Sequence, residues 1–213
     1  FTLAAMAAVL AVLLALLFAY GKRLRRDIVV QVPVRLASLG YAVPGTVIAI
    51  GVMIPLAYLD GRIDAAAEQW FGARTGLVFS GTLFALLLAY SVRFLAISLH
   101  SIETGLGRIK PSMDNAAQSL GLTPLQALLR VHVPLLRPSV LAALLLVFVD
   151  VLKELPATLI LRPFNFNTLA VRTYELASDE RLAEAALPAI AIVLVSLLPV
   201  ILLARSIEPA VKE

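Results

Sequence analysis

Long apolar runs separated by short polar segments dominate this chain. Three of the runs contain no charged side chain, the third in order carries only Arg93 near one end, and the fourth carries three charges near its middle. Each has roughly the 20 residues that a helix needs to cross the hydrocarbon core of a bilayer. The pattern predicts an all-α, polytopic transmembrane bundle with about five spans, at residues 1–20, 36–59, 76–99, 139–161 and 185–204.

The composition supports a membrane protein. Of 213 residues, 61% are hydrophobic and only 15% are charged, with a mean hydropathy of +0.94. An ordinary soluble domain is about half apolar and about a quarter charged, so a soluble fold with a large apolar core is the weaker alternative. The chain has no cysteine, which excludes disulfides and thiolate metal sites.

The basic residues are distributed unevenly between the polar segments. If these segments alternate between the two sides of the membrane, one side holds Lys22, Arg23, Arg25, Arg26, Arg35, Arg93, Arg108, Lys110, Arg130, Arg137, Arg205 and Lys212. The other side holds only Arg62, Arg74, Arg162, Arg172 and Arg181. Cytoplasmic loops of membrane proteins are enriched in such residues, so we expect the N-terminus outside and the C-terminus in the cytoplasm. The net charge of +4 then reports topology and gives no support for a nucleic-acid partner.

Helix breakers interrupt the second apolar run, which contains Gly40, Pro44, Gly45, Gly51 and Pro55. Such residues persist in a bilayer where neighbouring protein or a water-filled cavity satisfies the freed backbone groups. We therefore expect this span inside the bundle, with a kinked, lipid-facing helix as the alternative.

A polar segment, residues 112–134, separates the third and fourth runs. Asp114 is placed to cap a first short helix, and Gly121 suits the left-handed residue that ends it. Residues 123–126 then match a capping box, with proline at the first helical position. We expect a second helix that runs to about Val131 and ends before Pro134.

Two short helices on the cytoplasmic face suit a docking function, because the small side chains of Ala116 and Ala117 would let a partner approach the backbone closely. The alternative is an ordinary connector that lies on the lipid headgroups.

The segment resembles the cytoplasmic EAA loop of ATP-binding-cassette (ABC) importer permeases: Glu-Ala-Ala, three residues, Gly, nine residues, then Ile-x-Leu-Pro. Here Asn115 replaces the glutamate and two valines replace the isoleucine and leucine, so no salt bridge of that glutamate carries over. The matching positions are Asn115, Ala116, Ala117, Gly121, Val131, Val133 and Pro134.

Residues 38–51 and 151–189 resemble the second half of iron(III)-type permeases, a group close to thiamine and spermidine/putrescine permeases. The resemblance implies a type I ABC importer permease fold, similar to that of methionine importers, with a cytoplasmic coupling helix in the bacterial inner membrane. It also implies that residues 1–213 form a single permease domain, one half of a longer two-half permease.

The implied partners are an ABC ATPase dimer, a second permease half and an extracytoplasmic solute-binding protein, with iron(III) as the expected solute and thiamine or a polyamine as alternatives. ATP and Mg²⁺ would bind the ATPase, and we expect no cofactor on this chain. A phosphate-binding loop needs Gly-x4-Gly-Lys-Ser/Thr, whereas the only Gly-Lys pair, Gly21–Lys22, lacks the rest of that motif.

Charged residues inside the fourth run raise a second functional question. Asp150, Lys153 and Glu154 would share one helical face, and each would cost about 2.5–3.5 kcal/mol if it faced lipid. We expect Lys153 to pair with both carboxylates and this face to line or gate the translocation path, with Pro156 loosening the helix beyond it. A structural cluster that holds two permease halves together is the alternative.

Other chemistry finds less support. Oxygen donors suit iron, but their spacing singles out no ligand set, so we assign no metal site among Tyr90, Tyr174, Glu175, Asp179 and Glu180. His100 and His132 are expected to be bystanders. An intramembrane enzyme would need a His-Glu-x-x-His motif or a nucleophile with a nearby base, and the sequence shows neither. An ion-driven secondary transporter would not need the 112–134 segment.

Overall fold

The structure is a computed structural model that describes residues 1–25 and 27–207; Arg26 and the tail from 208, which includes Lys212, lie outside the described residues. Every regular element within the described residues is helical, which confirms the expected all-α fold. In chain order they are α1 (Thr2–Leu24), α2 (Ile28–Ser38), the 3-10 turn η1 (Gly40–Ala42), α3 (Gly45–Phe71), α4 (Leu83–Gly107), α5 (Pro111–Ser119), α6 (Pro124–Ala127), the π-helical turn η2 (Leu128–His132), α7 (Val133–Leu135), α8 (Arg137–Leu152), α9 (Pro156–Leu161), α10 (Leu169–Ser178) and α11 (Leu182–Ile207).

Four helices are long and apolar enough to cross a membrane: α1, α3, α4 and α11. A fifth span results if α6–α7 and α8, which are bent by 79° relative to one another, are counted together. The expectation of about five spans is therefore confirmed.

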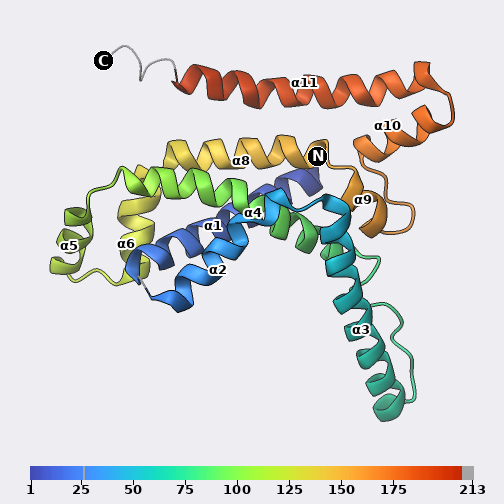
Figure 1. The fold of residues 1–213 in the computed structure, drawn as a ribbon, viewed down its shortest axis with the longest axis horizontal. Helices are drawn as coiled ribbons and strands as arrows, with labels where there is room; N and C mark the ends of the chain where they lie inside the picture. The colour runs from blue at the N-terminus through green and yellow to red at the C-terminus, as the bar shows by residue number, and fades with distance from the viewer. Residues whose placement is uncertain (26, 208–213) are drawn as a thin grey trace.

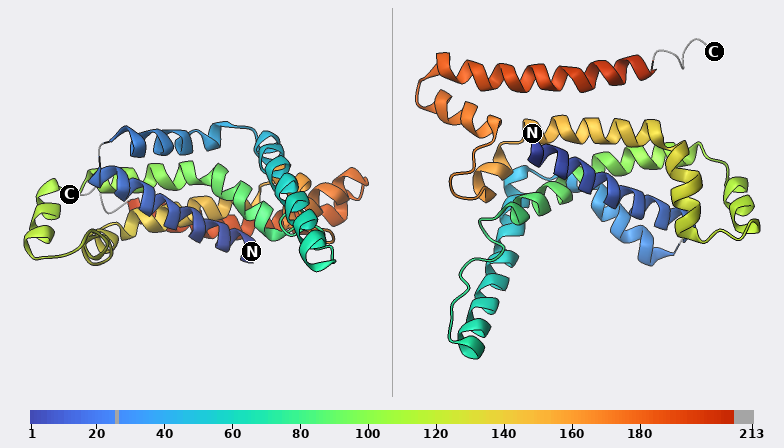
Figure 2. Two further views of the ribbon diagram at one scale, coloured as in Figure 1. Left: turned by 90° about the horizontal axis from the view of Figure 1, so that it is seen from below. Right: turned by 180° about the vertical axis from the view of Figure 1, so that it is seen from behind.

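Helices α1, α4 and α8 pack against one another and form the centre of the bundle. Helix α1 approaches its neighbours closely because alanines recur every three or four residues along its buried face, at positions 4, 8, 11, 15 and 19. Helix α3 projects away from the bundle beyond its first turns, whereas α11 runs alongside α8 (Figures 1 and 2).

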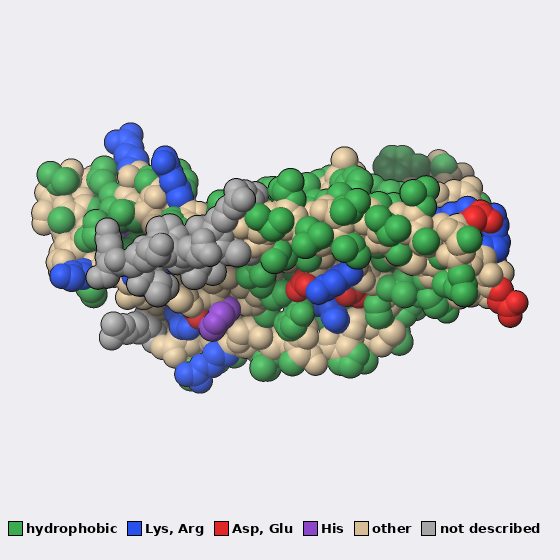
Figure 3. All heavy atoms as spheres, turned by 90° about the horizontal axis from the view of Figure 1, so that it is seen from above, with side chains coloured by type: hydrophobic (Ala, Val, Ile, Leu, Met, Phe, Trp, Pro, Cys, Tyr) green, Lys and Arg blue, Asp and Glu red, His purple; other side chains and the backbone are tan. Residues whose placement is uncertain are grey.

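The two ends of the bundle carry different elements. The α5–α6 hairpin lies at the end toward which α11 runs, and α9 and α10 lie at the opposite end (Figure 1). Phe1 is at the α9–α10 end, because it lines a cavity there together with Phe166 and Thr168. The face seen from above is mostly hydrophobic, with charged side chains toward its ends and in one small group near its middle (Figure 3).

The second apolar run is not one continuous helix. The chain turns at Gly40 and restarts as α3 at Gly45, and that helix continues past the predicted end of the span at residue 59 to Phe71. Gly40 allows this turn to pack closely against α4, since a Cβ there would lie 2.1 Å from the Val92 carbonyl oxygen. The expected position inside the bundle applies to the turn at Gly40 and to the first turns of α3, where Ile48 and Ala49 are buried, whereas most side chains farther along α3 are exposed.

The third span starts later than expected, at Leu83 rather than Gly76. The reason is Asp60 on α3, whose buried carboxylate accepts hydrogen bonds from the backbone N–H groups of Val78, Phe79 and Ser80 at 2.8–3.2 Å. These bonds hold the preceding loop in a non-helical path until Thr82 caps α4.

Two prolines in the last apolar run, Pro188 and Pro199, suggest interruptions in sequence terms, but both lie inside the continuous helix α11. Proline is tolerated within membrane helices when local adjustments satisfy the carbonyl that loses its donor.

Candidate functional site

The hairpin formed by α5 and α6 has the predicted geometry at its turn. Gly121 has a φ of +77°, the left-handed conformation that glycine adopts without strain. Its N–H donates to the Gln118 carbonyl, and the N–H of Leu122 donates to the Ala117 carbonyl, which together form a Schellman motif. The turn is therefore determined by local chemistry.

The start of the second helix also matches the prediction. The Thr123 hydroxyl accepts from the Gln126 N–H, the Gln126 side chain accepts from the Thr123 N–H, and Pro124 occupies the first turn. The end of this helix is different from the prediction. A π-helical turn and α7 extend it past Pro134 to Leu135. Pro134 lies in the first turn of α7, where proline is tolerated.

The residues matched to the EAA loop do not share one face. The exposed ones are Asn115, Ala116, Gly121 and Pro134, the half-buried ones are Val131 and Val133, and Ala117 is buried. Of the two alanines, only Ala116 can therefore face a partner.

The spacing of Leu125, Leu128 and Leu129 predicts an apolar stripe on the second helix; Leu125 and Leu129 are exposed, whereas Leu128 is buried. We call the exposed apolar side chains of this segment, Met113, Leu120, Leu125 and Leu129, the hairpin surface. Leu120 is 81% exposed because it directly precedes the left-handed glycine at the tip. The signal that was available is a leucine beside a helix-ending glycine in a segment that is otherwise small and polar.

The sequence predicts that Asp114 caps α5, but the structure shows that it does not. Lys110 occupies the cap position, and the Asp114 side chain turns toward the bundle instead. One of its oxygens accepts two hydrogen bonds from Arg23 of α1, at 2.7 and 2.9 Å, and the other lies 2.6 Å from Nε2 of His132. These partners draw the carboxylate inward because both carry N–H groups in a mostly buried setting.

His132 and Arg23 therefore have roles that the sequence analysis missed. His132 was taken as a bystander, yet its side chain is fully buried and its ring lies 5.1 Å from that of Tyr20. Arg23, counted in the sequence only as one of the basic residues of the predicted cytoplasmic side, donates to Asp114 and to the carbonyls of Leu106 and Ile109. Their long separation along the chain left no sequence signal for this cluster.

The fourth apolar run breaks near its charges. Helix α8 ends at Leu152 and α9 begins at Pro156, whose ring lacks an N–H and would clash with a continuing helix. The predicted shared face of Asp150, Lys153 and Glu154 is wrong for this reason. Lys153 pairs with Asp150 alone, at 2.7 Å, and its side chain is 63% exposed.

Glu154 is buried and faces Arg93 of α4, with Nε 3.3 Å from Oε2. Its other oxygen accepts from the N–H of Ala157 in α9, at 3.1 Å. Arg93 also donates to the Val43 carbonyl at 3.0 Å and lies over the rings of Tyr41 and Phe94. We call Arg93 and Glu154 the break pair. The signal was the single charge in an otherwise uncharged run, but nothing in the sequence indicated its partner.

The break pair joins three parts of the fold at one point. Gly45, the first residue of α3, is in contact with it: a Cβ there would lie 2.7 Å from Glu154 Oε1 and 3.1 Å from Arg93 Nη1. The start of α3, the middle of α4 and the α8–α9 break therefore meet here.

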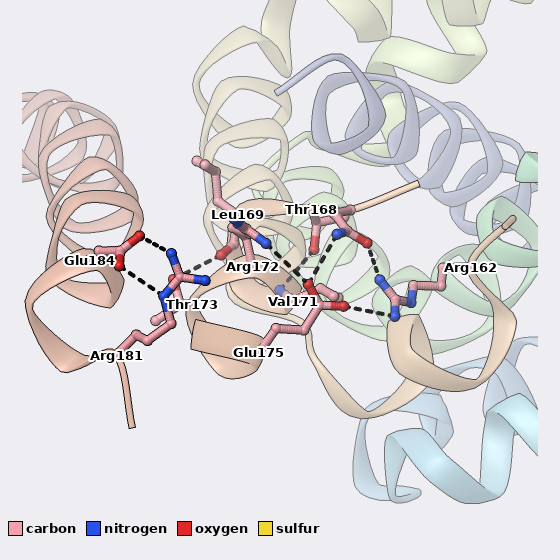
Figure 4. A network of polar contacts seen from close by, with 10 residues as sticks. Arg162, Thr168, Leu169, Val171, Arg172, Thr173, Glu175, Arg181 and Glu184 are labelled. Atoms are coloured by element: carbon pink, nitrogen blue, oxygen red, sulfur yellow. Dashed lines mark hydrogen bonds and ion pairs between the residues drawn. The ribbon is translucent and has the colours of Figure 1, made fainter. Parts of the chain in front are cut away.

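The candidate oxygen ligands are dispersed. Tyr90 is hydrogen bonded to Thr158 at 2.5 Å, and Glu175 pairs with Arg162 and Asn167 at 3.0 Å each, in the network of Figure 4. Across residues 1–25 and 27–207, no three histidine or acidic side chains lie close enough together to hold a metal ion.

Outside the spans, Arg181 is paired with Glu184 at the start of α11 (Figure 4). The hydrogen bonds and charge of Glu184 raise the pKa of the Arg181 guanidinium above its ordinary value, so this pair stays ionised. It closes the turn between α10 and α11.

An all-helical bundle with apolar spans and a polar hairpin at one end defines a polytopic membrane protein. Residues 4–213 match the family described as binding-protein-dependent transport system inner membrane component, and the chain belongs to that family. The resemblance to importer permeases is thereby confirmed.

Two curated relatives and one solved structure illustrate the match. The chain is 30% identical over 171 residues to the Fe(3+)-transport system permease protein FbpB 2 of Haemophilus influenzae, covering 80% of this chain and 31% of the relative. It is 30% identical over 164 residues to the putative 2-aminoethylphosphonate transport system permease protein PhnV of Salmonella typhimurium, covering 77% and 56%. A bacterial ABC transporter that imports alginate shares the fold, with a TM-score of 0.71, 16% identity, and coverage of 100% of this chain and 77% of that one. The chain thus spans about a third to a half of these curated relatives.

Proposed function

We propose that this chain forms a permease half of an ATP-driven importer and lines the path of a solute delivered by an extracytoplasmic binding protein. The observation that carries the proposal is the α5–α6 hairpin, a rigid turn at one end of the bundle with an exposed apolar surface. Family membership supports the same conclusion.

In this proposal the chain provides the solute path and a separate subunit hydrolyses ATP. Its sequence has no phosphate-binding loop, so ATP and Mg²⁺ belong to a separate ATPase dimer that docks on the hairpin surface. A second permease half would complete the path. In this arrangement the hairpin is cytoplasmic, the N-terminus lies outside, and the C-terminus lies in the cytoplasm.

Iron(III) is the proposed solute, supported by the likeness to FbpB 2. The likeness to PhnV, at the same identity, makes an aminophosphonate a specific alternative, and a molybdenum transport system permease, ModB of Haemophilus influenzae, is 31% identical over 100 residues, covering 47% of this chain and 42% of that one. Thiamine and polyamines remain the alternatives from sequence resemblance. The binding protein would select among these solutes.

Reconstitution tests the proposed function. The full natural polypeptide would be placed in proteoliposomes with its cognate ATPase and binding protein, which is offered iron(III), 2-aminoethylphosphonate, molybdate, thiamine or putrescine in turn. We expect iron(III) to stimulate both ATP hydrolysis and uptake. Stimulation by another solute would correct the substrate, and uptake driven by an ion gradient without ATP would replace the importer with a secondary transporter.

The docking surface can be tested with two adjacent residues. Ala116 is exposed and Ala117 is buried, so Ala116→Cys should crosslink to a cysteine-bearing ATPase while Ala117→Cys should not. Equal crosslinking of both variants, or none by either, would remove the hairpin as the docking site.

We further propose that the α8–α9 break, with Asp150, Lys153, Glu154 and Pro156, gates the translocation path. Lys153 supports this role because its charge is exposed in the middle of an apolar run, where an unneeded charge is costly. Glu154 would contribute indirectly, through the break pair, because it is buried against α4.

Lys153→Met tests the gate. The side chain is exposed, so we expect normal expression and ATPase docking with uptake reduced about tenfold. The matched control is Arg74→Met, which removes another exposed cation from a single ion pair, far from the break. Equal uptake by the two variants would favour the alternative, in which the charges only hold two permease halves together.

A further inference from the structure

Three segments that are distant in the sequence meet at the carboxylate of Asp114. Its Oδ2 accepts from Nε and Nη2 of Arg23, and its Oδ1 lies 2.6 Å from Nε2 of His132. Asp114 belongs to α5, Arg23 to the last turn of α1, and His132 to the π turn that follows α6. We call these three residues the Asp114 node.

Arg23 extends the node to a fourth element. Its Nη1 donates to the Leu106 carbonyl at 2.6 Å and its Nη2 to the Ile109 carbonyl at 2.8 Å. The Leu106 carbonyl lies in the last turn of α4, and the Ile109 carbonyl lies just beyond the end of that helix. The planar guanidinium, with several donors in fixed directions, suits such simultaneous contacts, which a lysine could not reproduce.

The node is shielded and geometrically specific. His132 is fully buried, and the Asp114 and Arg23 side chains are each 17% exposed. Charge-assisted hydrogen bonds of this kind are shorter and stronger than neutral ones. The neighbouring pair of Lys22 and Glu103 also joins α1 to α4, but it is one contact between two partly exposed side chains.

The node stands where motion of the hairpin would enter the bundle. The segment α6–η2–α7 continues into α8 through the 79° bend, and α8 leads to the break at Lys153 and Glu154. A cleft of about 470 Å³, lined by Arg23, Glu103 and Asp114 among others, lies between α1, α4 and α5. Without the node, α5 would have room to shift while α1 and α4 stayed in place.

We propose that Asp114 is a positioning residue that makes the hairpin move as one body with α1, α4 and the start of α8, so that ATPase closure is converted into movement of the spans. This proposal rests on the proposed function as an importer permease, and it assigns to Asp114 a role separate from ATPase contact. The carboxylate acts through Arg23 and His132, because both of its oxygens are directed into the chain.

The test is the ratio of solute taken up to ATP hydrolysed by the full transporter in proteoliposomes. Asp114→Asn keeps the size of the side chain but weakens both contacts, and we expect the ratio to fall about tenfold while hydrolysis persists. Glu103→Gln is the matched control, since it removes the neighbouring exposed pair and should leave the ratio unchanged. If Asp114→Asn does not fold, Arg23→Lys is the second variant, because lysine keeps the positive charge but lacks the planar guanidinium with its several donors.

A distance measurement separates positioning from other roles. Spin labels on exposed residues Arg25 and Ser119 report the separation of the end of α1 from α5. We expect a broader distance distribution in Asp114→Asn than in wild type or Glu103→Gln. An unchanged distribution, an unchanged ratio, or a parallel loss of hydrolysis and uptake would overturn the proposal. If wild type itself shows no ATP-dependent uptake, the proposed function fails instead.

Discussion

Two buried contacts between an arginine and a carboxylate organise this bundle, and they differ in what they join. At the hairpin end, Arg23 makes two hydrogen bonds to Asp114 and two to carbonyls at the end of α4. At the break, Arg93 makes one ion pair with Glu154 at 3.3 Å and one hydrogen bond to a carbonyl. The first contact consists of several hydrogen bonds that join α1, α5 and the end of α4. The second is a single ion pair between α4 and the α8–α9 break.

The difference indicates how a permease can combine rigidity with movement. A carboxylate whose two oxygens have separate partners resists displacement, because several charge-assisted bonds must break at once. A single buried pair holds one arrangement firmly only while both charges are present, because removing either leaves the other unneutralised. Under the proposed function, the hairpin end would transmit motion and the break would change shape.

The largest expected effect comes from breaking the second contact. Glu154→Gln keeps an acceptor for the Ala157 N–H but leaves Arg93 buried without a counter-charge, which should destabilise the protein by about 3 to 5 kcal/mol. Thermal unfolding in detergent measures the loss. The double variant Arg93→Met with Glu154→Gln should recover most of it, and equal destabilisation of the single and double variants would contradict the pairing.

A glycine next to the break pair provides the next test. Gly45→Ala would place a Cβ 2.7 Å from Glu154 Oε1, so we expect a loss of about 1–3 kcal/mol from overpacking. Gly51→Ala is the control, because it lies in the same helix and nothing lies within 4 Å of the added Cβ. The control should unfold at the same temperature or slightly higher, and a matching loss in both would mean that the tight contact at Gly45 has no energetic weight.

A smaller effect is expected at the hairpin, where the turn is maintained locally. Thr123→Ala removes the capping box of α6 and should cost about 1 kcal/mol. Hydrogen exchange of the α6 amides would show the loss as faster exchange confined to that helix. Ser119→Ala, whose hydroxyl bonds only to the Asn115 carbonyl on the exposed side of α5, should leave the exchange unchanged. Spread of the faster exchange into α4 would show that the cap also supports the bundle.

The smallest effect is expected for the exposed pair beside the Asp114 node. Lys22 and Glu103 are 40% and 34% exposed, so Glu103→Gln should cost only about 0.5 kcal/mol, and the difference from wild type should shrink in high salt. Comparing unfolding at low and high salt for this variant and for Asp114→Asn sharpens the contrast. A salt-insensitive loss in Glu103→Gln as large as that in Asp114→Asn would remove the distinction between the two pairs.

Predictions from sequence succeeded where the cause was local. The left-handed Gly121 and the Thr123–Gln126 capping box needed only neighbouring residues to form, and both are present. They failed where a distant residue intervened. Aspartate is a residue type that often caps helices, but hydrogen bonds from Arg23, which lies 91 positions earlier, hold the Asp114 side chain toward the bundle.

The boundaries of the spans show the same limit. Apolar run length located the spans, but the close packing of the turn at Gly40 involves the Val92 carbonyl, and the late start of α4 depends on Asp60. Likewise, Asp150, Lys153 and Glu154 have helical spacing, yet Pro156 ends that regularity and Glu154 turns to Arg93.

The amino-acid order by itself determined that this protein crosses a membrane several times as helix, and that it carries a polar hairpin with a glycine turn and a capped second helix. Those features arise from apolar run length and from contacts within a few residues, which form without help from distant parts of the chain. Tertiary structure decided which charges distant in the sequence are paired, which alanine is exposed and where α4 begins. Those outcomes depend on side chains brought together from positions tens of residues apart. In the apolar interior, an unpaired polar or charged group is costly, so side chains such as Asp114 and Glu154 are paired with distant partners.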